Sequence, residues 1–398
     1  MAQEHFHPRL DLGPWACRLG AGALALSMIA RMTVRVPAVF LLAAAVAVAC
    51  SSQTDPGASQ LANPGQPTPV AGGKAPAVPP NEARHLQNIK QLTSGGENAE
   101  AYFSADGTKL IFQRTTAEYP CDQQYTMNLD GSDMKLVSNG KGRTTCGYFN
   151  PDGKSIVYAS TFLGGAACPA VPGKEEGYVW PIYDSYDIFK ADADGGNLTR
   201  ITRTVGYDAE ATVAKDGRIV FTSVRDGDMD IYSMNGDGSD VKRLTNQPGP
   251  DGGAFFSADG TMIVFRGRHF DPGLELDGYM GLLKKALWRP SGLNVYVMNR
   301  DGSNLRQVTK HPGANWAPFF SPDGKKIIFA SNMNDPKGPN FDLFLINIDG
   351  TGLEQITTNT SFDGFPMFSP DGKKLVFASN RLAKNPTETN VFIADWLW

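Results

Sequence analysis

Short apolar stretches and polar turns alternate from residue 101 to the end of the chain, in a pattern that recurs six times. Each copy is an apolar segment, a turn containing Asp-Gly, and an alternating segment that ends in an aromatic residue. The copies are AYFSADGTKLIF (101–112), GYFNPDGKSIVY (147–158), ATVAKDGRIVF (211–221), AFFSADGTMIVF (254–265), PFFSPDGKKIIF (318–329) and PMFSPDGKKLVF (366–377). Asp-Gly favours tight hairpins because glycine adopts positive φ without a steric penalty. The pattern therefore predicts six β-hairpins.

A second hairpin pattern follows each of the first five copies, as in YSMNGDGSDVKRLT and YVMNRDGSNLRQVT. Each unit then holds four strands, a to d, with Asp-Gly turns joining a to b and c to d. Four antiparallel strands in a unit of roughly 43 to 64 residues are typical of a propeller blade. The sequence therefore predicts an all-β fold, a six-bladed β-propeller of four-stranded antiparallel blades.

The two ends of the repeat region predict how the ring closes. The last unit ends with NVFIADWLW, which supplies strand c but no strand d. Residues 88–93, NIKQLT, precede the first strand a and match the d strands DVKRLT and NLRQVT. We expect this N-terminal strand to complete the last blade, which removes the open sheet edges.

Two of the blades are long, and both insertions fall between strands b and c, at residues 161–187 and 269–292. The segment Met280–Leu287 is short, apolar and basic, and predicts a helical turn. In a propeller the b–c and d–a loops share one face, here called the insertion face. The Asp-Gly turns lie on the opposite face, here called the turn face.

The N-terminal region predicts export. Residues 1–49 are an upstream extension and a signal peptide, with Met32 as the expected start, Arg35 as the charged region and an apolar run from Val36 to Val48. Cys50 follows in a lipobox-like context and is the predicted lipidation site; an ordinary cleaved signal or an uncleaved anchor is the alternative. Residues 50–84 are rich in Pro, Gly and Ala and predict a disordered tether. The propeller is expected to span residues 85–398.

The repeat x-F-S-P-D-G-K-K-[IL]-[IV]-F-A-S-N, at Phe320–Asn332 and Phe368–Asn380, resembles the propeller repeats of the TolB family. The resemblance covers residues 88–398 and implies a TolB-like propeller in an exported protein. The chain departs from TolB because a tether stands where TolB has an α/β domain. It is closer in pattern to a group of exported TolB-like propellers. The same repeats occur in peptidases and lyases, so the resemblance implies a fold more than an activity.

One polar position recurs eight residues before each of the six turn aspartates, where the d–a loop enters strand a. It is occupied by Asn98, Thr144, Asp208, Asp251, Asn315 and Asp363. Sixfold repetition places these residues in a ring at the channel mouth. The ring either binds a ligand, such as calcium or a positively charged peptide, or closes the loops through local hydrogen bonds. Glu100 and Glu210, two residues further along, raise the acidity of the channel mouth.

Aromatic residues gather on the insertion face. Tyr207, Trp316 and Phe362 fall in d–a loops, and Tyr178, Trp180, Tyr183 and Trp288 fall in the two insertions. They suit a protein or peptide interface, or equally the packing of the insertions onto the ring. With Trp316 included, there are nine candidate ligand-binding residues at the channel mouth: Asn98, Glu100, Thr144, Asp208, Glu210, Asp251, Asn315, Trp316 and Asp363.

Three cysteines, Cys121, Cys146 and Cys168, are expected on the insertion face. They can form one disulfide and leave one thiol. Cys121–Cys146 is the preferred pairing, with Cys146–Cys168 and three free thiols as the alternatives.

Several classes of function lack their signature. A net charge of -4 without a long basic run disfavours nucleic acid. No G-x-S-x-G elbow indicates a serine hydrolase. His269 and His311 are the blade histidines, too few for a three-histidine metal site, and the segment Asp226–Asp230 is a better solvated turn than a calcium loop. No cofactor is predicted, catalytic residues are not assigned, and the metal content is left open, with calcium at the channel mouth as the candidate ion.

The sequence thus predicts a monomeric, membrane-tethered binding module that presents an acidic and aromatic face to a protein or peptide of the cell envelope. The location is periplasmic or at the cell surface, and Ser51 favours the outer membrane in a cell that has one. The alternative is a hydrolase or lyase that acts on an envelope peptide or glycan. Asp208, Glu210, Asp251 and Asp363 would then be its acid and base groups.

Overall fold

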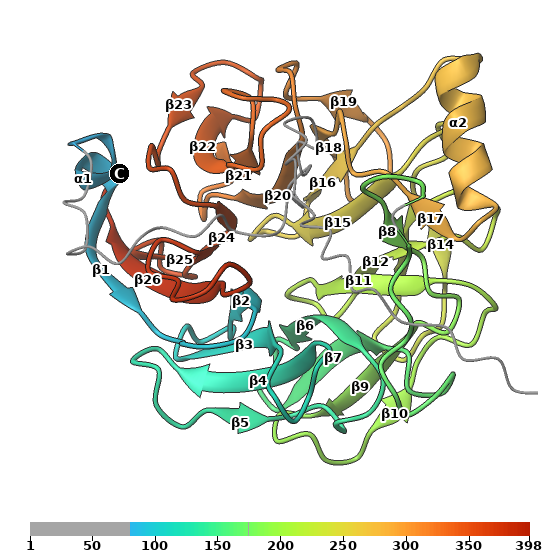
Figure 1. The fold of residues 1–398 in the computed structure, drawn as a ribbon, viewed down its shortest axis with the longest axis horizontal. Coiled ribbons are helices and arrows are strands. Elements are labelled where there is room, and N and C mark those ends of the chain that lie inside the picture. Colours follow the sequence, from blue (N-terminus) through green and yellow to red (C-terminus); the bar gives the residue numbers. More distant parts are fainter. Residues whose placement is uncertain (1–79, 174) are drawn as a thin grey trace, which may run out of the picture. The chain divides into compact units, whose positions relative to one another are not determined.

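The computed structural model describes residues 80–173 and 175–398. Over these residues the chain forms six four-stranded antiparallel sheets, set side by side around a common axis (Figure 1). The prediction of an all-β, six-bladed propeller is therefore confirmed. The predicted signal peptide, Cys50 and most of the predicted tether lie outside the described residues.

Each blade runs from an inner strand a to an outer strand d. The a strands are β2 (Asn98–Phe103), β6 (Thr144–Phe149), β11 (Asp208–Val213), β15 (Asp251–Phe256), β20 (Asn315–Phe320) and β24 (Asp363–Phe368). The b strands are β3 (Lys109–Arg114), β7 (Ser155–Ser160), β12 (Ile219–Ser223), β16 (Met262–Gly267), β21 (Lys326–Ser331) and β25 (Lys374–Ser379). Most b strands are almost wholly buried, as expected for strands with neighbours on both edges and blades packed on both faces.

The outer strands complete the sheets. The c strands are β4 (Gln123–Asn128), β9 (Asp187–Asp192), β13 (Asp230–Met234), β18 (Asn294–Asn299), β22 (Asp342–Asn347) and β26 (Asn390–Trp396). The d strands are β5 (Lys135–Leu136), β10 (Thr199–Arg200), β14 (Lys242–Arg243), β19 (Arg306–Gln307), β23 (Glu354–Gln355) and β1 (Leu86–Gln91). Most d strands are only two residues long, which limits the exposed edge that each blade offers.

Strand β1 closes the ring by pairing with β26 in the last blade, which confirms the predicted closure. It keeps the signature of the other d strands. Asn88 has φ 52°, as Asn304 at the same place in another blade has φ 53°. Thr93 Oγ1 accepts a hydrogen bond from the Val391 N–H (2.9 Å), as Thr309 does from Val295 (2.9 Å). The closing strand is thus held by the same contacts that hold strand d elsewhere.

The end of the predicted tether overlaps a helix. Residues Pro80–His85 form helix α1, which packs onto the last blades. The Glu82 carboxylate is buried and accepts hydrogen bonds from Arg381 (3.2 Å) and Asn359 (2.8 Å). The imidazole of His85 stacks on Trp396 with 4.9 Å between ring centroids. The composition of this segment did not reveal these contacts, because their partners Arg381, Asn359 and Trp396 lie far along the chain.

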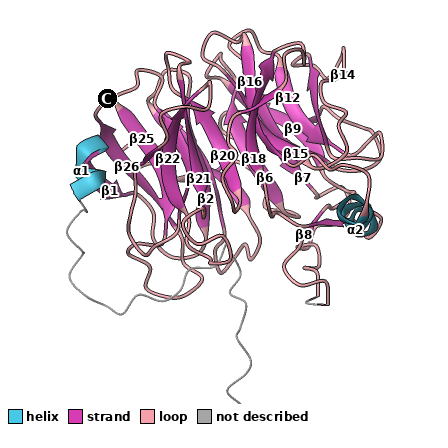
Figure 2. Ribbon diagram, turned by 90° about the horizontal axis from the view of Figure 1, so that it is seen from above, coloured by secondary structure: helices cyan, strands magenta, loops and turns pink. Residues whose placement is uncertain are grey.

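The two insertions meet on the insertion face. The first carries β8 (Trp180–Pro181), and the second carries helix α2 (Leu274–Leu283) followed by β17 (Leu287–Trp288). Strands β8 and β17 pair antiparallel, and we call this two-stranded element the arch. Figure 2 shows α2 and β8 on the same side of the blades. The predicted helical turn therefore exists, but it begins six residues earlier, at Leu274, and ends at Leu283.

Helix α2 is joined to the blades by a hydrogen bond of Tyr279. The Tyr279 hydroxyl donates a hydrogen bond to Asp228 (2.6 Å) in the loop between β12 and β13. Asp228 also accepts from the Gly249 N–H (2.9 Å).

No helix of the described residues is long and apolar enough to cross a membrane.

Candidate functional site

Six polar residues, here called the collar, begin the six a strands at the insertion face. They are the positions singled out in the sequence: Asn98, Thr144, Asp208, Asp251, Asn315 and Asp363. Each is at most 1% exposed. The sequence located them at the correct end of strand a, but their burial leaves almost no surface for a ligand.

The carboxylates of the collar are paired within the chain. Asp208 accepts from Arg225 (2.8 Å), and Asp363 accepts from Arg381 (2.9 Å). Asp251 lies 3.0 Å from His269 Nε2, and burial raises the pKa of this carboxyl. Each of these three carboxylates is therefore already paired with a basic side chain of its own blade.

The neutral members of the collar bind main-chain carbonyls. Asn98 Nδ2 donates to Thr389 O (3.0 Å), Asn315 Nδ2 donates to Leu293 O (2.9 Å), and Thr144 Oγ1 donates to Asp122 O (3.0 Å). Such bonds close the entrance of strand a, as in the structural alternative of the sequence analysis. The burial of the collar does not support a ligand-binding role, and that role stays a prediction.

A second ring lies two residues further along each a strand. Every a–b pair contains a β-bulge, which places one extra residue on strand a. The third residue of each a strand has φ between 48° and 60° and is partly exposed, unlike the collar two residues before it. We call these residues the bulge ring: Glu100, Cys146, Glu210, Gly253, Ala317 and Phe365.

The bulge ring has the features of a functional position. A non-glycine residue with positive φ is strained by roughly 1 kcal/mol or more, and five of the six members are not glycine. The six share partial exposure in the centre of the propeller, where solvent reaches them. Glu100 and Glu210 were predicted here; Cys146, Ala317 and Phe365 were not, although all six lie six residues before a turn aspartate.

Glu210 is a fixed and neutralised member of the ring. Arg266 donates two hydrogen bonds to its carboxylate (2.7 and 3.2 Å), and Thr222 and the Gly253 N–H donate two more (2.7 and 2.8 Å). Burial alone would raise the pKa of Glu210, but the charge and hydrogen bonds of Arg266 lower it. The guanidinium also lies 5.3 Å from the ring centroid of Trp288. Glu210 therefore stays ionised, and its carboxylate oxygens are already hydrogen-bonded within the chain.

Glu100 is in a different state. Among the described residues, its hydrogen-bond donor is the Cys146 thiol, at 2.8 Å from Oε2, and no cationic side chain pairs with it. Burial raises the pKa of Glu100 to about 7, and the negative charge of Glu210 adds to the shift. Burial, followed by the charge of Glu100, also raises the pKa of the Cys146 thiol. The thiol is therefore a hydrogen-bond donor at neutral pH and not an activated nucleophile.

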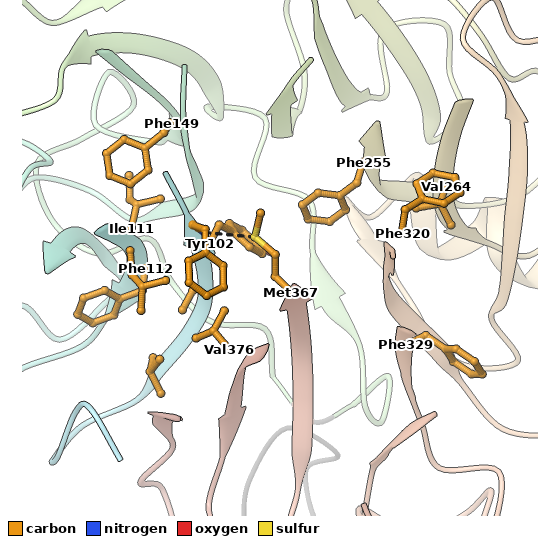
Figure 3. Packing of buried hydrophobic residues seen from close by; sticks show 14 of the residues in the cluster. Tyr102, Ile111, Phe112, Phe149, Phe255, Val264, Phe320, Phe329, Met367 and Val376 are labelled. Carbon is orange, nitrogen blue, oxygen red and sulfur yellow. Dashed lines mark hydrogen bonds between the residues drawn. The ribbon is translucent and has the colours of Figure 1, made fainter. Parts of the chain in front are cut away.

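An aromatic plug closes the channel toward the turn face. It is formed by Tyr102, Tyr148, Phe255, Phe319 and Met367, two residues beyond the bulge ring on five a strands. The rings of Tyr102 and Phe255 come from opposite blades and lie 5.3 Å apart, and Phe255 lies 5.3 Å from Phe319. Figure 3 shows Tyr102, Phe255 and Met367 converging. These contacts lie between the bulge ring and the turn face, and Tyr148 and Phe319 of the plug are themselves partly exposed.

Aromatic side chains connect the arch to the bulge ring. Trp180 lies 5.5 Å from Trp288 within the arch and 5.9 Å from Trp316 on β20. Trp316 in turn lies 4.7 Å from Phe365 of the bulge ring. Trp288, Trp316, Tyr207 and Phe362 are buried, so they pack the insertions onto the ring. Tyr178, Trp180 and Tyr183 stay partly exposed and remain available to a partner.

The cysteine pairing differs from the preferred prediction. The disulfide joins Cys121 to Cys168, with their Cα atoms 5.8 Å apart, and Cys146 is a free thiol. The preferred Cys121–Cys146 pairing is wrong because Cys146 belongs to the bulge ring and turns its thiol toward Glu100. The disulfide instead fixes the first insertion to the loop of the neighbouring blade.

No three His, Cys, Asp or Glu side chains within residues 80–173 and 175–398 are arranged to hold a metal ion. In the segment Asp226–Asp230, Asp226 accepts from Tyr232 and Asp230 pairs with Arg243 (both 2.6 Å). Its carboxylates therefore point to separate protein partners. Calcium at the channel mouth stays a prediction.

Comparison with known proteins finds similarity to a TolB propeller domain in part of the chain. The family model described as the TolB beta propeller domain matches residues 289–386. A TolB homologue from Chlorobium luteolum is 30% identical over 146 residues, which cover 36% of this chain and only 28% of that protein.

Two solved structures share the fold. The putative TolB from Agrobacterium tumefaciens has a TM-score of 0.50 and 18% identity, over 79% of this chain and 99% of that chain. A gluconolactonase from Xanthomonas campestris also has a TM-score of 0.50, with 13% identity over 79% of this chain and 92% of that chain. At these identities the likeness concerns the fold alone. The repeat sequence and the family match show that part of the chain is similar to the TolB β-propeller domain, and the blades give the whole repeat region a propeller fold.

Proposed function

We propose that the chain is an exported, lipid-tethered binding module whose insertion face takes a protein or peptide segment of the cell envelope. The observation that carries the proposal is the asymmetry of the channel. The bulge ring is partly exposed beside a partly exposed aromatic arch, whereas on the turn-face side aromatic side chains contact one another across the channel. A partner would therefore bind at the insertion face.

Exposed apolar side chains support the same face. The three most exposed large aliphatic residues are Val205, Leu274 and Val171, at 91%, 90% and 75%. Val205 lies in a d–a loop, and the other two lie in the insertions. Apolar side chains at loop tips, around an aromatic centre, are typical of surfaces that bind proteins.

The enzyme alternative has less support. Asp208, Asp251, Asp363 and Glu210 are the predicted acid and base groups, and each is held by a basic side chain of the chain itself. Glu100, with a pKa of about 7, is the one ring carboxylate suited to proton transfer, but the neighbouring thiol is protonated.

Photo-crosslinking tests the proposed face. A photoreactive residue at Val205 reports on the insertion face, and one at Val241 (40% exposed) on a c–d turn is the matched control. In envelopes we expect a discrete protein adduct from position 205 and none from position 241. Equal adducts from both positions, or none from position 205, would exclude a binding role for this face.

Membrane attachment has a separate test. If Cys50 carries the lipid, Cys50→Ser moves the protein from the membrane to the soluble fraction, and Cys146→Ser leaves it at the membrane. The outer membrane is the proposed site in a cell that has one. Unchanged fractionation of Cys50→Ser would contradict the tether without touching the binding face.

A further inference from the structure

A groove on the turn face lies between two neighbouring blades, the second (β6, β7, β9 and β10) and the third (β11 to β14), which are side by side in Figure 1. It holds about 370 Å³ and is lined by the a–b turns of both blades, by Lys190 of β9 and by Gly236 of the third blade. The six blades repeat one pattern, so the counterparts of a residue in the other blades show what the fold alone requires. Three polar residues of this groove, Asn150, Lys190 and Lys215, depart from that pattern.

Lys190 occupies the fourth position of its c strand, which is buried in the other five blades. Its counterparts are Thr126, Ser233, Val297, Leu345 and Ile393. Lys190 is partly exposed, and its ammonium group forms no ion pair or hydrogen bond among the described residues. A charge without a partner between two blades is destabilising, because it loses part of its hydration without compensation. The packing of the blades therefore does not explain why a lysine stands here.

Lys215 is the second unusual cation. It precedes Asp216 in the a–b turn of the third blade, where the other five blades have alanine or proline: Ala105, Pro151, Ala258, Pro322 and Pro370. It lines the groove and, within the part of the chain that the structure describes, it also forms no ion pair. Two ammonium groups from two different blades thus line one groove.

Asn150 is the third departure. Four blades have serine at this position, and each serine donates a hydrogen bond to its turn aspartate at 2.6 to 2.7 Å. Asn150 lines the groove and is 5% exposed, and its side-chain Nδ2 is buried without an acceptor among the described residues. A buried donor without an acceptor is costly, so this amide is a second, independent sign of a ligand. Because the terminal torsion of asparagine is soft, a small rotation presents the N–H to an acceptor in the groove.

The two carboxylates of the groove are already engaged. Asp152 accepts from the N–H groups of Lys154 (2.8 Å) and Ser155 (3.1 Å), and Asp216 pairs with Arg300 (2.5 Å). With Arg300 included, three cationic side chains and two carboxylates meet here, so the groove keeps an excess of positive charge. The groups left without partners are two cations and one amide donor, so the group that completes them is an acceptor and an anion.

We infer that this groove binds a phosphate group, held by Lys190, Lys215 and the Asn150 amide. A lysine ammonium binds phosphate as a point charge, whereas bidentate recognition of a planar carboxylate favours arginine. The three donors come from two turns and one strand, and a phosphate offers oxygens in several directions, whereas a carboxylate offers two in one plane. The phosphate is either free or part of a phospholipid headgroup. The site lies on the opposite face from the proposed protein partner and does not depend on it.

Calorimetric titration of the purified full-length chain tests this at pH 8. The probes are inorganic phosphate, glycerophosphoglycerol, which is the soluble headgroup of an anionic phospholipid, and acetate. We expect saturable binding of phosphate and binding of acetate that is weaker by about tenfold or more. Tighter binding of inorganic phosphate than of the headgroup assigns the site to a free phosphate, and equal or tighter binding of the headgroup assigns it to a lipid surface. No binding of either phosphate probe, or equal binding of acetate, overturns the inference.

Variants that restore the repeat pattern locate the ligand. Lys190→Val and Lys215→Ala give these positions side chains that other blades already carry there, and we expect each to weaken phosphate binding by about tenfold or more. Asn150→Ser removes the amide donor and should weaken binding by about threefold. Lys325→Ala is the matched control, because this lysine is 82% exposed on the turn face of another blade, and it should leave the affinity unchanged.

Melting curves show which variants are folded. If Lys190→Val does not fold, the exposed position of Lys215→Ala still decides. An unchanged affinity in the folded lysine variants, or an equal loss in Lys325→Ala, would show that phosphate is attracted by the general surface charge and would overturn the site.

Discussion

The collar and the bulge ring are two layers of one channel, two residues apart, and they differ in almost every physical respect. The collar is entirely polar, at most 1% exposed, and hydrogen-bonded to its own or a neighbouring blade. The bulge ring is mixed in composition, partly exposed, and strained. Polarity alone therefore pointed to the structural layer. Exposure and backbone conformation point to the functional one.

The cysteines give the largest expected difference between a structural position and the ring. Replacing both Cys121 and Cys168 by alanine opens a crosslink over 47 residues. On the chain-entropy estimate this lowers the free energy of unfolding by about 4 kcal/mol. Cys146→Ala, in the ring, is expected to change it by less than about 1 kcal/mol. Urea denaturation of the two variants checks this, and similar losses in both would erase the distinction.

The collar itself should be costly to alter. Asp208→Ala leaves the mostly buried Arg225 without its carboxylate and is expected to cost about 3 kcal/mol. Glu100→Ala removes a carboxylate that has no cationic partner, and is expected to leave the protein at least as stable at pH 8. Urea midpoints give both values. A larger loss for Glu100→Ala would mean that the ring is the structural layer.

The pH dependence of stability should also come from the ring. Because the pKa of Glu100 is raised to about 7, the folded state holds its proton where the unfolded state has lost it. Its contribution to stability is full below pH 4.5 and is lost as the pH rises to about 7. In Glu100→Gln the decline of the melting temperature between pH 5 and pH 8 should be smaller. An unchanged decline would show that other buried carboxyls, such as Asp342, dominate it.

The smallest effect concerns strain. Ala317 has φ 48°, so Ala317→Gly should raise the free energy of unfolding by roughly 1 kcal/mol. Ala211→Gly, in an ordinary buried strand position next to the ring, should lower it by a similar amount. Calorimetric unfolding distinguishes the signs. A loss of stability in both variants would contradict a strained ring.

The fold was predictable because the same sequence repeat occurs six times. Asp-Gly turns at regular spacing gave the blades, and the match of residues 88–93 to other d strands gave the closure, now seen in Asn88 and Thr93. The arch was not predictable, because β8 and β17 are two residues long and more than 100 residues apart. Nothing in their spacing marks them as partners.

The site was only partly predictable. Counting from the turn aspartates located the a strands correctly, but the count ignored the bulge. One extra residue on strand a changes which side chains face the channel. The polar collar residues are therefore buried within the blades, and the third residue of each a strand faces the channel. Arg266 was missed for a different reason. It is a lone charge in an apolar b strand, and its partner Glu210 lies 56 residues before it.

The most direct test of the account is a crystal structure of the full chain bound to the partner that position 205 crosslinks. The account predicts side chains of the partner against the bulge ring and the arch, with the collar unchanged. A partner bound to Asp208, Asp251 or Asp363, with the bulge ring unoccupied, would contradict it and make the collar the ligand-binding layer.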